Sequence, residues 1–369
     1  MDFAFKNNTI TEIGDPHNGG KRVTLLSENQ IYKPRSMLWE WLLLSEGSPL
    51  RVQMNKIARE ENLSNPFDSF PELQFSSSDF NQNGKVNKVA DLRNELIISK
   101  NSLLKFGEAI GVCCWLGISD LHCDNILFSL GREKIPLITP VDIEPIFNEV
   151  TLPSQTSLLP KKNTPLDRAG LYPLLINSYS FNEFDALNLI SGFLSSIEFL
   201  DKYSQQFLIS IRDYADVNSL TRVVLRATRD YVSFLNQSSP VIKWAEFSPE
   251  LLEEEKLQLA NGDVPVFYRK IGDTALLYQS ESKGYKEVSL SSNYWDRFDI
   301  LEPMIVDPNR SLILRRDTSN LKKIGSLQLL RVFGQKINQG VAETDGIKVI
   351  YENESIELEA KEFSCKCLR

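Results

Sequence analysis

The stretch SDLHCDNIL, residues 119–127, restricts the fold and chemistry of this chain most strongly. It places Asp120, His122 and Asn125 directly before an apolar run that begins at Ile126. A phosphoryl-transfer site needs a carboxylate that orients the attacking hydroxyl, and oxygen ligands for a metal ion that neutralises phosphate charge. One tight loop supplies both here, and the histidine would brace the loop or aid proton transfer. The alternative is a loop whose polar side chains only satisfy one another, and this stretch alone does not separate the two interpretations.

A second acidic motif, VDIE at 141–144, follows an apolar run that reads as a strand. We expect Asp142, together with Asn125, to hold a magnesium ion, with Glu144 as a further oxygen ligand. Mg²⁺ takes few protein ligands because it also binds phosphate oxygens, so two or three suffice. The order of Asp120, Asn125 and Asp142 along the chain is therefore kinase-like and favours phosphoryl transfer.

The N-terminal part of the chain carries the groups expected to bind ATP. The loop GDPHNGG at 14–20 ends in Gly19 and Gly20, whose backbone N–H groups could approach a phosphate closely. Lys33 closes a short β-prone run and is followed by Arg35, so both cations are expected to contact nucleotide phosphates. The alternatives are an ordinary turn and an edge lysine in water.

A basic segment at 221–231 is expected to be helical, within an apolar helical region that runs from 183 to 235. Arg222 and Arg226 would then share one helix face, where paired guanidinium groups suit a phosphate. The alternative is a solvated helix face on which Asp230 pairs with Arg226.

Composition limits the class of protein. The chain has 369 residues, 42% hydrophobic and 24% charged, which is ordinary for a globular protein. Its net charge of −8 gives no electrostatic support to nucleic-acid binding. We also expect no signal peptide, no membrane contact and a cytoplasmic location, because no apolar stretch is long enough to span a bilayer and the five cysteines suggest free thiols. A metal site at Cys365 and Cys367 is disfavoured, because no second pair accompanies them.

The remaining patterns predict a mixed α+β fold. Strands are expected within 10–36, at 125–128, at 137–141, within 264–278 and near 347–358; helices at 91–116, 183–235, 249–260 and 325–337; and irregular structure at 64–90.

In this order the motifs resemble those of one family, the dehydratase domain of class II lanthipeptide synthetases (the LanM family). The resemblance covers about residues 12–270 and rests on GDPHNGG, YKPRS, DLHCDNI, DIE, RVVLRATRDY and GDVPVF. It implies a two-lobed fold related to protein and lipid kinases, with a β-rich N-lobe over 1–110 and a larger, mainly helical C-lobe over 111–369. This chain differs from the family in that its glycine-rich loop begins at residue 14 and Asp124 stands where glutamate is common. Its five cysteines and two histidines supply no set that could bind the metal of the family's cyclase domain. We therefore expect a compact stand-alone protein without the zinc-dependent cyclase domain.

The resemblance also implies a two-step reaction on a peptide or protein substrate. ATP and Mg²⁺ phosphorylate a serine or threonine, and the phosphate is then eliminated to leave a dehydroamino acid. The family's phosphorylation residues match Lys33, Asp120, His122, Asn125 and Asp142, and its elimination residues match Arg222 and Thr228.

Two alternatives remain open at the level of sequence. A small-molecule kinase of the aminoglycoside or choline type shares the spaced Asp and Asn, but the blocks at 32–36 and 120–125 favour the lanthipeptide-type reading. A partner-binding pseudokinase is disfavoured, because four residues are intact: Lys33, Asp120, Asn125 and Asp142.

Overall fold

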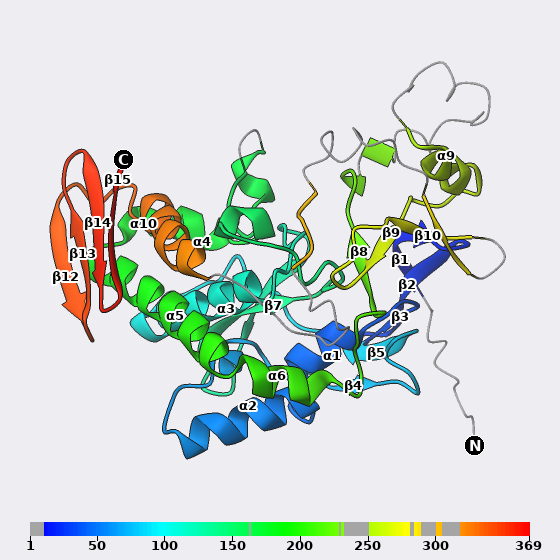
Figure 1. The fold of residues 1–369 in the computed structure, drawn as a ribbon, viewed down its shortest axis with the longest axis horizontal. Helices are drawn as coiled ribbons and strands as arrows, with labels where there is room; N and C mark the ends of the chain where they lie inside the picture. The colour runs from blue at the N-terminus through cyan, green and yellow to red at the C-terminus, as the bar shows by residue number, and fades with distance from the viewer. Residues whose placement is uncertain are drawn as a thin grey trace, which may run out of the picture. The chain divides into compact units, whose positions relative to one another are not determined.

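The computed structural model shows an α+β protein with several small antiparallel sheets (Figure 1). The structure describes residues 11–161, 164–228, 230–231, 251–280, 284–288, 300–304 and 318–369. The chain forms two compact units. The first comprises 1–38, 74–88 and 218–302, and the second comprises 39–73, 89–217 and 303–369. This division differs from the single expected boundary at residue 110, because segments remote in sequence pack together within each unit.

The first unit contains a five-stranded sheet in the order β1-β2-β3-β5-β4. Its strands are β1 (Thr11–His17), β2 (Lys21–Ser27), β3 (Gln30–Lys33), β4 (Phe75–Ser76) and β5 (Gly84–Asn87). The expected strands within 10–36 are confirmed. Two expectations are wrong: β1 continues to His17 through an irregular register after Ile13, and residues 64–90 supply two strands of this sheet. In both cases the segment becomes a strand because it pairs with a neighbouring strand, which its local composition does not reveal.

A second sheet of the first unit runs in the order β11-β10-β9-β8. It comprises β8 (Leu220–Val223), β9 (Phe267–Lys270), β10 (Leu277–Gln279) and β11 (Tyr285–Glu287), and α9 (Glu253–Ala260) precedes β9. The expected helix across 220–223 is wrong. Thr221 and Val223 are buried while their neighbours are half-buried, so the segment alternates in strand fashion and pairs with β9.

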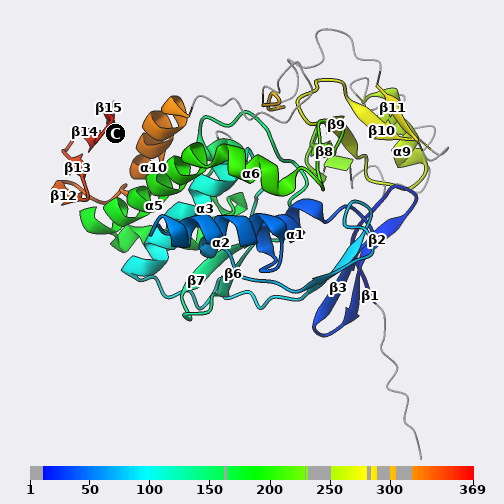
Figure 2. The same ribbon diagram turned by 60° about the horizontal axis from the view of Figure 1, so that its bottom comes forward.

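The second unit is mainly helical, and in Figure 2 α3 lies beside α5. Its main helices are α1 (Leu38–Leu44), α2 (Pro49–Glu60), α3 (Lys100–Trp115), α4 (Tyr172–Asn177), α5 (Glu183–Lys202), α6 (Ser204–Ile211) and α10 (Ser326–Phe333). Glycines allow α3 and α5 to cross closely, since a Cβ at Gly107 would lie 2.0 Å from the Leu189 carbonyl oxygen. The expected helix over 91–116 begins only at residue 100, because Ser99 caps it by accepting the Ser102 N–H.

Two further sheets complete the second unit. The expected strands at 125–128 and 137–141 are confirmed as a hairpin of β6 (Ile126–Leu130) and β7 (Pro136–Pro140). The C-terminal sheet is a meander, β12 (Gly340–Thr344), β13 (Ile347–Tyr351), β14 (Ser355–Ala360) and β15 (Phe363–Leu368), which contacts α10 (Figure 1). Short 3₁₀ helices are η1 (Pro66–Ser69), η2 (Pro153–Thr156), η3 (Leu166–Arg168) and η4 (Ser178–Ser180), and η6 (Leu321–Gly325) is a π-helical segment that leads into α10.

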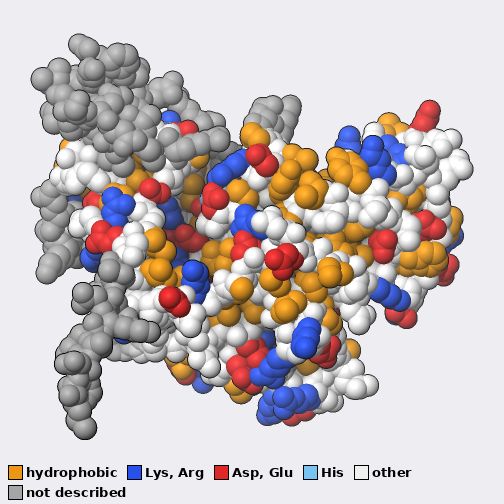
Figure 3. All heavy atoms as spheres, turned by 180° about the vertical axis from the view of Figure 1, so that it is seen from behind, with side chains coloured by type: hydrophobic (Ala, Val, Ile, Leu, Met, Phe, Trp, Pro, Cys, Tyr) orange, Lys and Arg blue, Asp and Glu red, His pale blue; other side chains and the backbone are white. Residues whose placement is uncertain are grey.

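The surface gives no single electrostatic signature on the face shown in Figure 3, where acidic and basic side chains are interspersed among apolar ones. No described helix combines the length and apolar character needed to cross a bilayer. All five cysteines are free thiols, as expected.

Candidate functional site

The loop before β6 brings three predicted residues together in the second unit. The Asn125 side-chain amide donates to the Asp120 carbonyl oxygen at 2.9 Å, and its nitrogen lies 3.5 Å from His122 Nε2. His122 Nε2 is 3.7 Å from Asp120 Oδ1. The Asp120 and His122 side chains are about a quarter exposed, so solvent and ligands can reach them. The loop therefore presents one carboxylate, one imidazole and one amide at a single accessible place.

Backbone hydrogen bonds hold this loop at several points. The Ser119 N–H donates to Pro145 O, the Leu121 N–H to Thr156 O and the Cys123 N–H to Arg168 O, at 2.9–3.1 Å. Asp120 has a φ of 63°, which few residues other than glycine, asparagine and aspartate adopt. Unusual backbone that surrounding bonds hold in place is frequent at functional sites.

The β6–β7 hairpin brings Asp142 into the neighbourhood of this loop. The Val141 N–H donates to Asn125 O at 3.0 Å, so Asp142 directly follows the residue bonded to Asn125. Glu144 lies two residues further on, and both acidic residues are half-buried. Because the Asn125 nitrogen is committed to Asp120, its Oδ1 is the atom suited to a cation. An amide oxygen and carboxylates are the kinds of ligand that Mg²⁺ prefers, so the chemistry of these three side chains suits that ion.

Arg168 is a residue of this site that sequence reasoning missed. Its guanidinium bonds Asp124 Oδ2 at 2.9 Å. The Asp124 N–H in turn donates to His122 Nδ1 at 3.2 Å. Burial alone would raise the pKa of Asp124, but the charge and hydrogen bond of Arg168 outweigh it and hold that pKa below its ordinary value. Arg168 therefore favours the charged form of Asp124 beside the imidazole. No local sequence pattern links these two residues, which are 44 positions apart.

Three consecutive side chains of the loop place a nitrogen, a sulfur and a carboxylate oxygen within 4.8 Å of one another. They are His122, Cys123 and Asp124. Burial raises the pKa of the Cys123 thiol, which disfavours the thiolate that metals bind. Since Asp124 is also paired with Arg168, these residues do not make a convincing soft-metal site.

In the first unit, the glycine-rich loop meets an internal partner. The N–H groups of Gly19 and Gly20 donate to the Asp263 carboxylate at 2.6 and 2.7 Å. Lys33 ends β3 and is buried, and Arg35 Nη1 donates to Ser36 O at 2.9 Å. These glycine N–H groups therefore already have an anionic partner, which the sequence did not indicate.

The basic segment of the first unit is not the expected helix face. Arg222 lies on β8, opposite Tyr268 of β9. Arg226 Nε donates to Glu255 Oε1 at 3.0 Å, and the Tyr231 hydroxyl donates to the same oxygen at 2.6 Å. Glu255 is fully buried and forms an ion pair with Arg226.

Thr228, the second predicted elimination residue, is half-buried and also lies in the first unit. The predicted residues are thus divided between the units. Gly19, Gly20, Lys33, Arg35, Arg222 and Thr228 belong to the first, and Asp120, His122, Asn125, Asp142 and Glu144 to the second.

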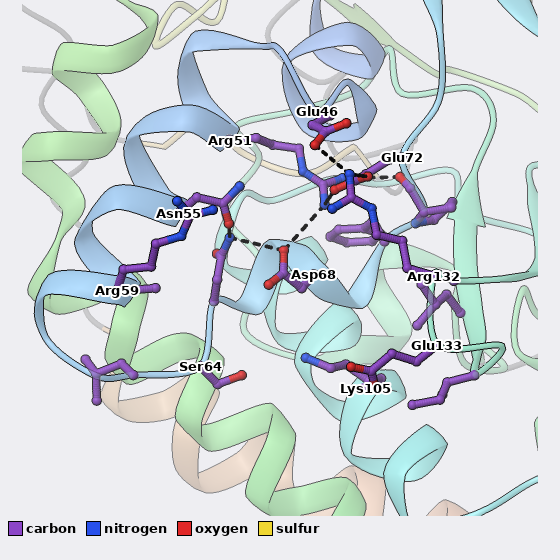
Figure 4. A pocket seen from close by; sticks show the side chains of 18 of the residues that line it. Glu46, Arg51, Asn55, Arg59, Ser64, Asp68, Glu72, Lys105, Arg132 and Glu133 are labelled. Carbon is purple, nitrogen blue, oxygen red and sulfur yellow. Dashed lines mark hydrogen bonds and ion pairs between the residues drawn. The ribbon is translucent and has the colours of Figure 1, made fainter.

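A polar cavity of about 650 Å³ lies in the second unit, apart from the predicted residues (Figure 4). Its charges pair with one another: Arg132 contacts Glu46 and Glu72, and Arg51 lies 3.6 Å from Asp68 and 3.7 Å from Glu72. The Arg51 side chain is fully buried, and burial lowers its pKa despite the two carboxylates. The simplest function of this network is to fix the chain around α2.

Replacing Arg51 with alanine is expected to lower the free energy of unfolding by about 3 kcal/mol, because it removes a fully buried side chain together with its ion pairs to Asp68 and Glu72. The change also removes the Nη1 hydrogen bond to Pro71 O. Urea denaturation would measure the loss. Arg132→Ala is the control, since that side chain is 68% exposed and should shift the midpoint little. Equal shifts for the two variants would contradict the structural role.

The two sets of residues offer different chemistry. The second unit supplies a carboxylate, an imidazole and oxygen ligands for a cation, and the first supplies cations and a glycine-rich loop. Comparison of the sequence with protein-family models and with curated proteins found no match.

Proposed function

We propose that this chain is an ATP-dependent kinase of a lanthipeptide-dehydratase type, which phosphorylates serine or threonine hydroxyls of a peptide or protein. The observation that supports it most is the loop that brings Asp120, His122 and Asn125 together. Each pair of these residues has polar atoms no more than 3.7 Å apart. Asp142 follows the residue that is hydrogen-bonded to Asn125. This arrangement combines a proton acceptor with oxygen ligands, which is the requirement for phosphoryl transfer.

In this proposal Asp120 orients the substrate hydroxyl and accepts its proton as the oxygen bonds to the γ-phosphorus and ADP leaves. His122, held by Asp124, keeps the carboxylate in position. Asn125 and Asp142, with Glu144 beside them, would hold Mg²⁺. The ion supplies charge neutralisation for the phosphates when bound.

The groups of the first unit complete the proposal. Lys33 would bind nucleotide phosphates, and the β-rich first unit with the mainly helical second unit would correspond to the lobes of a kinase-like fold. Lys33 would contribute to phosphate binding through the compact positive charge of its ammonium group. The resemblance of the motif order to the LanM family supports this assignment.

The same resemblance supports a second step, elimination of the phosphate. Arg222 would hold the leaving phosphate while a base removes the α-proton of the phosphorylated residue, so that the C–O bond breaks and a dehydroamino acid remains. Thr228 is the second residue assigned to this step.

Intact-mass spectrometry of candidate peptides, after incubation with the protein, ATP and Mg²⁺, tests the proposal. A gain of about 80 Da would correspond to one retained phosphate. A loss of about 18 Da, one water, would show complete dehydration, by the same accounting of covalent changes. ATP turnover without any change in peptide mass would favour a small-molecule substrate of the aminoglycoside or choline class.

Replacing Arg222 with alanine separates the two steps. If Arg222 holds the leaving phosphate, the variant should accumulate phosphorylated peptide while phosphorylation continues. The mass spectrum then shifts from dehydrated to phosphorylated product. Arg212→Ala is the control, because Arg212 is 71% exposed and forms an ion pair with the neighbouring, also exposed Asp213. An unchanged product pattern in Arg222→Ala would rule out the elimination role.

A further inference from the structure

A buried carboxylate closes the glycine-rich loop of the first unit. The Asp263 side chain is 4% exposed and accepts both the Gly19 N–H and the Gly20 N–H, one on each oxygen. Both bonds, at 2.6 and 2.7 Å, are short, as expected when the acceptor is ionised. The contact joins residues 243 and 244 positions apart.

The backbone of the loop is shaped for this contact. Asn18, Gly19 and Gly20 have φ values of 49°, 85° and 78°, a left-handed run. Successive N–H groups in such turns converge on one anion. A Cβ at either glycine would meet nothing within 4 Å, so there is room for a side chain. Glycine is favoured at these positions because it adopts the left-handed conformation without strain.

The turn that carries Asp263 is itself fixed to α9. The Asp263 N–H donates to Gln258 O at 3.0 Å, and the Gln258 side chain accepts the Val266 N–H at 2.9 Å. The Val264 N–H donates to Pro16 O at 2.8 Å, and His17 Nδ1 lies 3.0 Å from Val264 O. The aspartate therefore extends toward the loop from a turn that hydrogen bonds hold to α9 and to residues 16 and 17.

The burial of Asp263 decides which way the glycine N–H groups face. Because their acceptor is almost inaccessible, these N–H groups point into the first unit and do not face solvent. A nucleotide phosphate would reach them only after the carboxylate had left. The internal anion thus occupies the place that a phosphate would take in a conventional glycine-rich loop.

We infer that Asp263 is a positioning residue, whose carboxylate fixes the conformation of residues 17–20 in place of a ligand anion. The loop then offers its outer side to nucleotide, a consequence that rests on the proposed kinase function. We call the pair of hydrogen bonds from Gly19 and Gly20 to Asp263 the clasp. The clasp follows from the contacts alone and does not depend on whether the chain binds ATP.

Hydrogen–deuterium exchange of the loop, measured by mass spectrometry on the whole chain, tests the clasp. In Asp263→Ala we expect the Gly19 and Gly20 amides to exchange faster by about tenfold or more, since two hydrogen bonds to a charged group are lost. Asp263→Asn keeps the side-chain volume and one oxygen acceptor, and should give an intermediate rate. Asp273→Asn is the matched control, an exposed aspartate of the same unit that accepts the Ala275 N–H.

Formate provides a test that a loss of folding cannot imitate. In Asp263→Ala, sodium formate should slow the exchange of the two glycine amides relative to sodium chloride at equal ionic strength, because its carboxylate can replace the missing anion. The wild type should not respond. Unchanged exchange in Asp263→Ala, or equal rates in formate and chloride, would overturn the clasp.

Calorimetric titration with Mg²⁺ and ATP tests the consequence for nucleotide. Asp263→Ala should bind ATP more weakly, and formate should restore part of the affinity. Faster loop exchange with unchanged ATP affinity would overturn the positioning role. A wild type that binds no ATP, while the exchange results hold, would instead count against the kinase proposal and leave the clasp in place.

Discussion

Replacing Asp120 with asparagine is expected to lower the rate of phosphoryl transfer by about 10³-fold, because the substrate hydroxyl loses its proton acceptor. The fold should not change. Asn125 bonds the backbone oxygen of Asp120 and not its carboxylate, so the loop retains that bond. The assay is the appearance of phosphorylated peptide or, before a substrate is known, of ADP.

Asparagine is the informative replacement at this position, because it tolerates the φ of 63°. Alanine would also remove activity, but it adds backbone strain of about 1–2 kcal/mol and mixes the two effects. Asp345→Asn is the matched control in the same unit. Asp345 is exposed, has a φ of 50° and lies in the turn between β12 and β13.

Two results would contradict the catalytic role of Asp120. Full transfer activity in Asp120→Asn would show that the carboxylate accepts no proton. A cooperative loss of folding in that variant, with Asp345→Asn stable in the same urea titration, would show that Asp120 is structural.

The sequence predicted those parts of the candidate site that depend on neighbours along the chain. Asp120, His122 and Asn125 share one loop, so their spacing sufficed to bring them together. Asp142 could be added because an apolar run, a turn and a second apolar run form the hairpin of β6 and β7. Short hairpins are decided by local patterns, and here the pattern was clear.

The sequence did not indicate partners that the fold brings together from a distance. Asp263 and Gly19 are 244 residues apart, and Arg168 and Asp124 are 44 apart. The alternative to a phosphate site placed Arg226 on a helix face beside Asp230, but Arg226 follows β8 and forms an ion pair with the buried Glu255. In each case the partner is a charged residue distant in sequence. Even Asp263, which lies in the GDVPVF motif, has no local signal that links it to the glycine-rich loop, so only tertiary structure identifies these pairs.

The misread strand has a similar origin. Residues 220–223 alternate between half-buried and buried, as in a strand. Four residues are too few to reveal this two-residue period in the sequence when the pattern of the preceding residues predicts a helix. Pairing with β9 decides the conformation, and tertiary context overrides propensity in such short segments. The kinase-like arrangement of the two units and the ATP-dependent activity stay predictions.

Gly117→Ala is expected to lower the free energy of unfolding by about 3 kcal/mol or more, through two effects that add. Gly117 follows the last turn of α3 with a φ of 60°, a conformation that glycine adopts at helix ends without strain. An added Cβ would also lie 1.9 Å from Asn148 O and 2.6 Å from Asn148 N. These are backbone atoms, so no side-chain rotation can relieve the contact.

The effect should extend to the candidate site, because the displaced backbone leads directly into Ser119 and Asp120. Asn148 bonds Gly117 O through its backbone N–H at 3.1 Å and its side-chain amide at 2.8 Å, and both bonds would have to shift. Urea denaturation measures the loss, with Gly47→Ala as control. A Cβ at Gly47 meets nothing within 4 Å and its φ is not left-handed, so that variant should be as stable as the wild type or slightly more so. If the two alanine variants unfold at the same urea concentration, the close approach of Gly117 to Asn148 does not exist in solution and cannot support the loop at 119–125.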